Sequence, residues 1–225
     1  MRAPLTIVIP TLNAEAGLAA TLEALMEGLS AGLIREVIVS DAGSQDRTAD
    51  IADEAGCDLV TGPPSRGGQL RRGAAAAKGD WLLFLHADTV LEAGWSDHVA
   101  AHMKSENAGY FRLRFNARGV GPKWVAAWAN LRSVLFGLPY GDQGLLISRV
   151  AYLEVGGYPE IPLMEDVAIA RALRGKLTPM SCVALTSWER YERAGWLKRG
   201  SRNLVTLLRY LLGASPEQLA ESYRK

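Results

Sequence analysis

The sequence has few of the features that mark several large classes of protein. Among its 225 residues are only two cysteines, Cys57 and Cys182, which show neither the spacing of a metal site nor the pattern of a disulfide framework. Both lie in apolar runs, so we expect reduced thiols in the core. The formal net charge is +1, whereas a nucleic-acid-binding domain usually carries a basic surplus. Nucleic acid is therefore not an expected partner.

Long apolar runs are also missing. No stretch reaches the length of about 18 apolar residues that a membrane-spanning helix needs. The first residues lead directly into the run Leu5–Pro10, without an apolar leader and a small-residue cleavage site. We therefore expect a soluble, cytoplasmic protein. The motifs G-x-G-x-x-G and G-x-x-x-x-G-K-[ST] do not follow the first strand, which disfavours dinucleotide and P-loop sites.

Short apolar runs alternate with helical patterns over the first half of the chain. Strands are predicted at Leu5–Pro10, Glu36–Ser40, Asp58–Thr61 and from Trp81, where five apolar residues read as a strand buried on both faces. Helices are predicted up to about Leu29, at Thr48–Ala55 and at Gln69–Ala77. This β-α-β order predicts a parallel sheet with right-handed crossovers.

The second half of the chain has a looser pattern. Tyr110–Phe115 alternates apolar and polar residues, which predicts an antiparallel edge strand. An apolar, partly helical stretch follows at Val125–Leu138, then a strand at Gly144–Ser148 and helices at Glu165–Leu173 and Lys198–Leu212. With no repeat or low-complexity linker, we predict one α/β domain over residues 1–225 with a C-terminal helical extension.

Polar side chains follow each strand of the first half. They are Thr11, Asn13 and Glu15 after the first strand, Asp41, Ser44 and Asp46 after the second, Arg66 and Gln69 after the third, and His86 and Asp88 after the fourth. Each cluster taken alone fits turn or capping chemistry, and Asp88 in particular would cap a helix from about Leu91. Four clusters in register instead predict a nucleotide site at one edge of the sheet.

Three further groups stand in the second half. Glu165 and Asp166 begin a predicted helix, where a carboxylate can complement the helix dipole or act as a general base towards a substrate hydroxyl. Gln143, in Gly141–Gln143, is a second polar candidate. In Ser187–Tyr191, Arg190 could neutralise a diphosphate, and Trp188 is expected to pack in the core.

These pieces together resemble the family 2 glycosyltransferases of the GT-A fold. The resemblance rests on four ordered segments over about three-quarters of the chain, Ile9–Glu15, Ser40–Thr48, Leu85–Asp88 in the place of the D-x-D motif, and Gly156–Pro159 with Met164–Asp166 in the place of the E-D motif. Arg66–Gln69, Gly141–Gln143 and Thr186–Ser187 are similar to a compact bacterial subgroup. The implied fold is a mostly parallel, Rossmann-like sheet flanked by helices, with a small antiparallel portion.

The resemblance implies an inverting glycosyltransferase that uses a nucleotide-diphosphate sugar, most simply a UDP-sugar, and an acceptor hydroxyl. Residues 1–115 would bind the donor and residues 116–187 the acceptor, with 188–225 as the helical extension. Asp88, with His86, would bind Mn²⁺ or Mg²⁺, Asp166 would be the base, and Glu165 would support it. The implied donor-binding residues are Pro10, Thr11, Asn13, Glu15, Asp41, Ser44, Arg66, Gln69, His86, Gln143 and Arg190.

One position departs from the family pattern, because His86 stands where D-x-D has its first acid. Imidazole suits Mn²⁺ better than Mg²⁺, which prefers oxygen. We therefore predict a Mn²⁺ preference or weak metal dependence. The same departure keeps open a non-catalytic sugar-nucleotide-binding module. A nucleotidylyltransferase is disfavoured, because the acidic, glycine-free turn Thr11–Glu15 could not hold a triphosphate.

The acceptor is not identified by any motif. Lys198, Arg199, Arg202 and Arg209 accompany the apolar face of the last long helix, Leu204, Val205, Leu208, Leu211 and Leu212. A basic amphipathic helix can lie on an anionic membrane, which would suit a lipid-linked acceptor and the inner membrane face, or it can pack on the sheet or in a homodimer. The aromatic side chains Trp124, Trp128 and Phe136 would line an acceptor pocket or fill the space beneath one.

Overall fold

The computed structural model describes residues 2–224, except for the side chains of residues 190, 193, 194, 197 and 224. Its strands are β1 (Leu5–Thr11), β2 (Ile34–Asp41), β3 (Asp58–Thr61), β4 (Trp81–Phe84), β5 (Thr89–Leu91), β6 (Ala108–Phe115), β7 (Leu145–Ser148) and β8 (Leu177–Thr186). Its helices are α1 (Glu15–Ser30), α2 (Thr48–Glu54), α3 (Arg66–Ala76), α4 (Trp95–His102), α5 (Val120–Phe136), the 3-10 helix η1 (Gly141–Gln143), α6 (Arg149–Glu154), α7 (Glu165–Ala172), α8 (Glu189–Ala194), α9 (Trp196–Leu211) and α10 (Pro216–Arg224).

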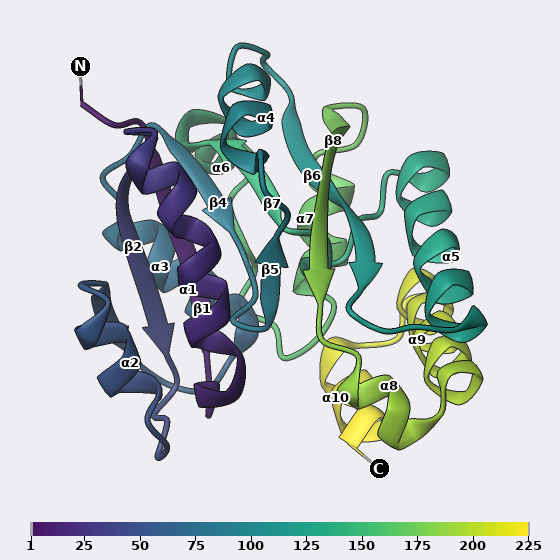
Figure 1. Ribbon diagram of the computed structural model, residues 1–225. Coiled ribbons are helices and arrows are strands. Elements are labelled where there is room, and N and C mark those ends of the chain that lie inside the picture. Colours follow the sequence, from purple (N-terminus) through teal and green to yellow (C-terminus); the bar gives the residue numbers. More distant parts are fainter. Residues whose placement is uncertain (1, 225) are drawn as a thin grey trace.

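The strands form one sheet in the order β3-β2-β1-β4-β7-β6-β8-β5 (Figure 1). The first four are parallel neighbours, which confirms the arrangement predicted from the β-α-β order. The direction changes at β7, which is antiparallel to both β4 and β6, and β5 is antiparallel to β8. Because β1, β2 and β4 run in the same direction, their carboxyl ends meet at one edge of the sheet.

Helices cover both faces of the sheet and bury a core on each. On one face, α1 and α4 pack on alternate residues of β1 and β4, among them Ile7 and Leu83. On the other face, α3, α6 and α7 pack on the intervening residues of the same strands, such as Val8 of β1 and Leu82 of β4. This two-sided burial is why the strands of the first half read as nearly continuous apolar runs.

Two predictions about local structure are wrong. The strand predicted at Tyr110–Phe115 is not an edge, because β6 pairs with β7 on one side and with β8 on the other. No helix begins near Leu91, since Thr89–Leu91 is strand β5 and α4 starts at Trp95. Asp88 is therefore not a helix cap, and that alternative to a role in the site is removed.

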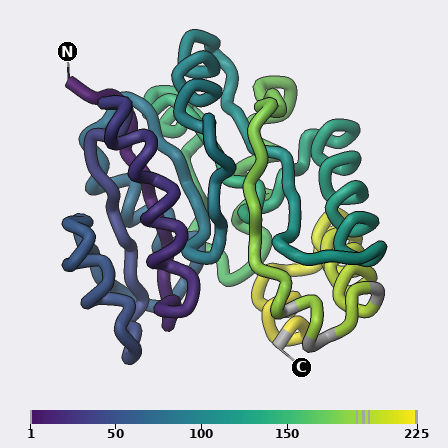
Figure 2. Tube along the Cα trace, in the orientation of Figure 1, coloured from purple at the N-terminus to yellow at the C-terminus, as the bar shows by residue number. Residues whose placement is uncertain are grey.

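The last three helices pack beside α5 and α7, at the end of the molecule away from β3 (Figure 2). Leu207 and Leu219 meet Val167 of α7. The apolar face predicted on α9 does not pack on the sheet: Leu208 is 50% exposed and Leu212 is 87% exposed. Trp124, Trp128 and Phe136 are also exposed, and neither line the cavity described below nor fill the space beneath it.

Two helix-interior glycines give a matched test of the packing. A Cβ atom on Gly73 of α3 would lie 2.3 Å from Cγ1 of the buried Val8, whereas one on Gly200 of α9 would meet nothing within 4 Å. We expect Gly73→Ala to lower the free energy of unfolding by about 1–3 kcal/mol through overpacking. Gly200→Ala should raise it by about 0.5–1 kcal/mol through the better helix propensity of alanine. Urea unfolding followed by circular dichroism measures both changes. If Gly73→Ala raised the free energy of unfolding as Gly200→Ala does, the packing of α3 on β1 would be contradicted.

Candidate active site

The carboxyl ends of β1 and β2 are joined through Asp41. Its carboxylate accepts hydrogen bonds from Thr11 Oγ1 at 2.8 Å and from the backbone N and Oγ of Ser44 at 2.7 and 2.5 Å. The backbone N of Gly43 donates a fourth at 2.8 Å. Burial acts to raise the pKa of Asp41, but these bonds to Ser44, Thr11 and Gly43 outweigh it and lower the pKa. Asp41 is thus an ionised, fixed anchor at the sheet edge.

The loops after β1 and β2 also bind each other directly. The backbone N of Asn13 donates to Ser44 Oγ at 2.8 Å, and Asn13 Oδ1 accepts from the backbone N of Gln45 at 2.9 Å. Glu15 Oε2 accepts from the backbone N of Arg47 at 3.0 Å. Two of the four predicted polar clusters, those after β1 and β2, are therefore joined in one network at the sheet edge.

Four predicted donor-binding residues lie beneath the surface, which are Thr11 and Asp41, described above, and Gln69 and Gln143. Gln69 is 6% exposed, and its amide donates to the carbonyl oxygens of Thr11 and Ser40 at 2.7 and 3.0 Å. Gln143 is fully buried; its Oε1 accepts from Ser133 Oγ at 2.6 Å, and its Nε2 donates to the carbonyl oxygen of Phe111 at 3.1 Å. The structure places both glutamines in the frame behind the site rather than on a cavity wall.

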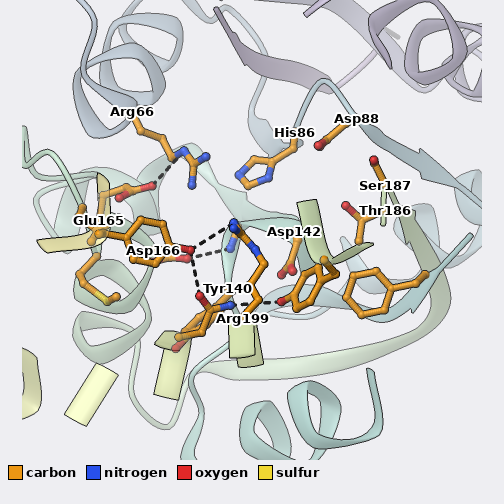
Figure 3. Close-up of a pocket in the computed structure, with 17 residues that line it drawn as sticks. Arg66, His86, Asp88, Tyr140, Asp142, Glu165, Asp166, Thr186, Ser187 and Arg199 are labelled. Carbon is orange, nitrogen blue, oxygen red and sulfur yellow. Dashed lines mark hydrogen bonds and ion pairs between the residues drawn. The ribbon is translucent and has the colours of Figure 1, made fainter. Parts of the chain in front are cut away.

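A cavity of about 130 Å³ lies where the two halves of the sheet meet (Figure 3). It brings together five of the predicted site residues, which are Arg66, His86, Asp88, Glu165 and Asp166. The remaining walls come from Phe115, Tyr140, Gly141, Asp142, Leu163, Met164, Thr186, Ser187, Tyr191, Arg199, Asn203 and Tyr223. Residues of the β1 and β2 loops, including Pro10, Thr11 and Asn13, do not line it.

Helix α1 fixes the segment that carries His86 and Asp88. Thr21 Oγ1 donates to the carbonyl oxygen of Ala87 at 2.9 Å. A Cβ on Gly17 would lie 3.1 Å from Cα of Asp88, so glycine is needed for this close approach. His86 packs against η1 on its other side, because a Cβ on Gly141 would lie 2.5 Å from its Nε2. The segment leaves β4 in one defined path towards the cavity.

The first turn of α7 presents the two predicted catalytic carboxylates. Asp166 Oδ2 accepts from the backbone N of Gly141 at 3.0 Å, and its Oδ1 accepts from the backbone N of Val167 at 2.7 Å. Glu165 is 2% exposed and lies 3.7 Å from Arg66 Nε (Figure 3). Burial and then Asp166 raise the pKa of Glu165, and Arg66 opposes them. Only Asp166 is half-exposed, so it is the carboxylate that can meet a substrate.

Asp142 is a cavity residue to which the sequence analysis gave no role. Its Oδ1 is buried and has no hydrogen-bond partner within the described part of the chain. Burial raises the pKa of Asp142 to about 6, with Arg132 opposing and Asp166 adding to the shift. The segment Gly141–Gln143 was singled out in the sequence, but periodicity could not show which of its side chains faces the cavity.

The C-terminal helices supply a wall that sequence reasoning missed. Arg199 of α9 donates to Tyr223 OH at 3.2 Å, and Asn203 Nδ2 donates to Tyr191 OH at 3.2 Å. Tyr191 stacks on Trp196 with ring centroids 5.0 Å apart. Trp188 packs beside them against a buried apolar cluster of β6 and α5 that includes Phe115 and Val125, which agrees with the core packing predicted for Trp188. The predicted donor-binding side chain of Arg190 lies outside the described residues.

Comparisons with known proteins identify the family to which the chain belongs. The sequence model of the family described as "Glycosyl transferase family 2" matches residues 6–142. A "PGL/p-HBAD biosynthesis glycosyltransferase" of Mycobacterium tuberculosis is 38% identical over 168 residues, covering 70% of this chain and 64% of the relative's length. The glucosyl-3-phosphoglycerate synthase of the same species is 33% identical over 98 residues, covering 38% of this chain and 29% of its own.

Solved structures show the same fold. A crystal structure of the Mycobacterium tuberculosis glucosyl-3-phosphoglycerate synthase with Mn²⁺, uridine-diphosphate and phosphoglyceric acid has a TM-score of 0.62 at 21% identity, over 93% of this chain and 78% of the other. Residues 1–349 of Staphylococcus aureus TarS in complex with UDP-GlcNAc have a TM-score of 0.60 at 15% identity, over 81% and 58%.

The chain therefore belongs to glycosyl transferase family 2, and the predicted GT-A type of fold is confirmed. It spans about 64% of the length of the mycobacterial biosynthesis glycosyltransferases. No helix among the described residues is long and apolar enough to cross a membrane. No cluster of three or more His, Cys, Asp or Glu among them could hold a metal ion by itself.

Proposed function

We propose that the chain transfers a sugar from a nucleotide-diphosphate sugar to an acceptor hydroxyl, with inversion at the anomeric carbon. The observation that carries the proposal is the shared cavity, in which His86 and Asp88 of the first half face Glu165 and Asp166 of the second. We assign residues 1–115 to a donor half, 116–187 to an acceptor half and 188–225 to a helical extension, from which Tyr191, Arg199, Asn203 and Tyr223 line the cavity. The donor is proposed to be a UDP-sugar, because the TarS and glucosyl-3-phosphoglycerate synthase structures hold UDP-GlcNAc and uridine-diphosphate.

The network at the ends of β1 and β2 supports a nucleoside site. Pro10, Thr11, Asn13, Glu15, Asp41 and Ser44 line or fix this edge. Asp41 is buried and its carboxylate already accepts four hydrogen bonds, so it would support the nucleoside site by fixing the two loops rather than by contacting the base. Gln69 and Gln143 act by holding the strand ends and η1 in place. Arg66, which is half-exposed at the start of α3, reaches the diphosphate side of the cavity.

The residues of the cavity fit a divalent cation shared with a diphosphate. Asp88 and His86 supply a carboxylate and an imidazole, and a Mg²⁺ or Mn²⁺ site commonly takes few protein ligands and completes its shell with phosphate oxygens and water. The buried, unpartnered Oδ1 of Asp142 adds a negative group to the same wall. When bound, the cation would act as a Lewis acid on the leaving diphosphate.

Asp166 has the geometry of the general base. Its two backbone hydrogen bonds fix the carboxylate at the mouth of the cavity. It takes the proton of the acceptor hydroxyl as that oxygen attacks the anomeric carbon, opposite the breaking bond to the diphosphate. The diphosphate leaves with the bonding electron pair, and its charge is met by Arg66. Glu165 supports the step by holding Arg66 from beneath.

Ligand-induced thermal stabilisation with a panel of nucleoside diphosphates tests the proposal. We expect uridine-diphosphate, the nucleotide of the proposed donor, to raise the melting temperature in the presence of Mn²⁺, because a ligand that binds only the folded state stabilises it. The corresponding nucleoside without phosphates should give a much smaller shift. If no nucleoside diphosphate shifted the melting temperature with either Mn²⁺ or Mg²⁺, the proposed donor site would be wrong.

A further inference from the structure

Helix α5 carries two apolar faces, and the chain covers only one of them. Val125, Ala126 and Ala129 pack beneath the helix with Leu113 and Phe115 of β6. On the other side, large apolar side chains recur every three or four residues, which places them on one face of a helix. These exposed residues are Val120, Trp124, Trp128, Leu131 and Leu135, of which Trp124 is 61% and Leu135 is 63% exposed.

Helix α9 repeats this arrangement. Its inner residues, Thr206 and Leu207, are buried, and Leu207 packs towards α7 and α10. Its outer residues are apolar and are between 37% and 87% exposed; they are Leu204, Val205, Leu208 and Leu211, with Leu212 just beyond the helix end. Most of the large apolar side chains exposed in the described part of the chain lie on these two helices.

The two helices run side by side in the same direction (Figure 1). At their starts, a Cβ on Gly121 of α5 would lie 3.1 Å from Cγ of Trp196. Beyond the end of α5, Leu138 packs with Leu207 of α9. The two exposed stripes therefore lie on neighbouring helices at one end of the molecule, and we call them together the α5–α9 face.

The charges around this face identify its occupant. Neither α5 nor α9 contains Asp or Glu. The basic residues Lys123, Lys198 and Arg209 are exposed, and Arg209 lies one turn from both Val205 and Leu212. A second copy would bring two positive rims together, which disfavours pairing. Aromatic and aliphatic side chains framed by lysine and arginine are instead complementary to an anionic lipid surface.

We propose that the α5–α9 face docks on an anionic membrane surface, with Trp124, Trp128 and the leucines of α9 inserted between headgroups. Arg199 and Asn203 of α9 line the catalytic cavity. These two residues lie on the side of α9 opposite its exposed leucines, so docking would hold the cavity about one helix diameter, roughly 10–12 Å, from the lipid surface. The docking itself rests on the two helices and does not depend on the proposed reaction.

Vesicle flotation tests the docking. We expect the protein to float with phosphatidylcholine vesicles that contain phosphatidylglycerol, and not with phosphatidylcholine alone. Trp124→Ser with Trp128→Ser and Leu208→Ser should abolish flotation. On addition of vesicles, tryptophan emission should shift to shorter wavelength in the wild type but not in this variant. Lys198→Gln with Arg209→Gln should weaken the partition constant about thirtyfold, because each basic residue near an anionic surface contributes about a fivefold factor.

Matched controls come from other surfaces of the chain. Val150 and Leu153 of α6 are 68% and 69% exposed, so Val150→Ser with Leu153→Ser removes similar apolar area elsewhere. Lys104→Gln with Arg174→Gln removes two other exposed charges. Both controls should float like the wild type. Failure of the wild type to float with phosphatidylglycerol at low salt, or a dimer in sedimentation that Trp124→Ser dissociates, would overturn the proposal.

The same variants separate this proposal from the proposed reaction. Uridine-diphosphate binding, measured by thermal shift in solution, should be unchanged in all of them, because none of the substituted residues lines the cavity. Loss of flotation with intact nucleotide binding supports a docking face. Nucleotide binding that fails in the wild type while flotation persists would reject the donor site and leave the docking face standing.

Discussion

Replacement of Asp166 by asparagine is expected to lower kcat by about a hundredfold to ten-thousandfold, the usual contribution of a positioned general base. The amide cannot take the proton of the acceptor hydroxyl, although it fills the same space. Donor binding should be nearly unchanged, because the donor residues belong to other elements. One backbone hydrogen bond, from Gly141 or Val167, would be lost, so a cost of about 1 kcal/mol in stability is expected. Release of the nucleoside diphosphate with donor and an acceptor alcohol both saturating measures kcat.

Two other carboxamide variants control for this experiment. Glu165→Gln removes the buried partner of Arg66 and should lower kcat less than Asp166→Asn. Asp97→Asn, on the exposed first turn of α4, should change neither kcat nor the KM of the donor. If Asp166→Asn kept the wild-type kcat, the base would have to be another carboxylate of the cavity. A wild type that binds the donor without any turnover would instead favour the non-catalytic binding module.

Much of the donor half could be predicted because its signals are local. Leu82 and Leu83 belong to a run of five apolar residues, which is typical of a strand covered on both faces, and the parallel order follows from the helices between strands. The carboxyl ends of parallel strands must share an edge. That rule predicts that Thr11, Asn13, Asp41 and Ser44 lie at one edge, but not the hydrogen bonds that join Thr11 to Asp41 and Asn13 to Ser44.

The position of β6 could not be predicted in the same way. Its alternation is real, since Arg112 and Arg114 are exposed while Phe111 and Leu113 are buried. Alternation reports which face of a sheet is covered, but it carries no information about the backbone partners at either side. The strand that makes β6 an interior strand, β8, was not predicted at all. Its Leu177–Thr186 sequence contains a proline and mixes polar and apolar residues.

The cavity wall of α9 shows a second limit. Helical periodicity correctly indicates that Leu204, Leu208 and Leu211 share a face. The common assumption that the most apolar face points inwards fails here, because Thr206 and Leu207 point inwards instead. Arg199 and Asn203 consequently face the cavity, and only the tertiary packing of α9 against α7 and α10 reveals them.

Replacement of Asp88 by alanine is expected to remove the metal-dependent part of nucleotide binding. At a ligand concentration about a hundredfold above Kd, binding stabilises the wild type by about 2.7 kcal/mol, and this stabilisation should largely disappear in the variant. The physical reason is that Asp88 is the one carboxylate predicted to bind the cation at the end of β4, on the segment fixed by Thr21. Thermal shift with uridine-diphosphate, with and without Mn²⁺, measures it.

The matched control lies at the other end of the same strand. Asp80 precedes Trp81 at the exposed amino end of β4, so Asp80→Ala should keep the full Mn²⁺-dependent shift.

A third variant, His86→Asp, introduces the acid that the family pattern has at this position. If the imidazole causes a Mn²⁺ preference, this variant should respond nearly as well to Mg²⁺, since Mg²⁺ prefers oxygen ligands. A wild type that is equally active with low concentrations of Mg²⁺ and Mn²⁺ would contradict that preference. An Asp88→Ala protein with an undiminished Mn²⁺ effect would move the cation away from the β4 end, with Asp142 as the next carboxylate to test, because its buried oxygen lacks a partner within the described chain.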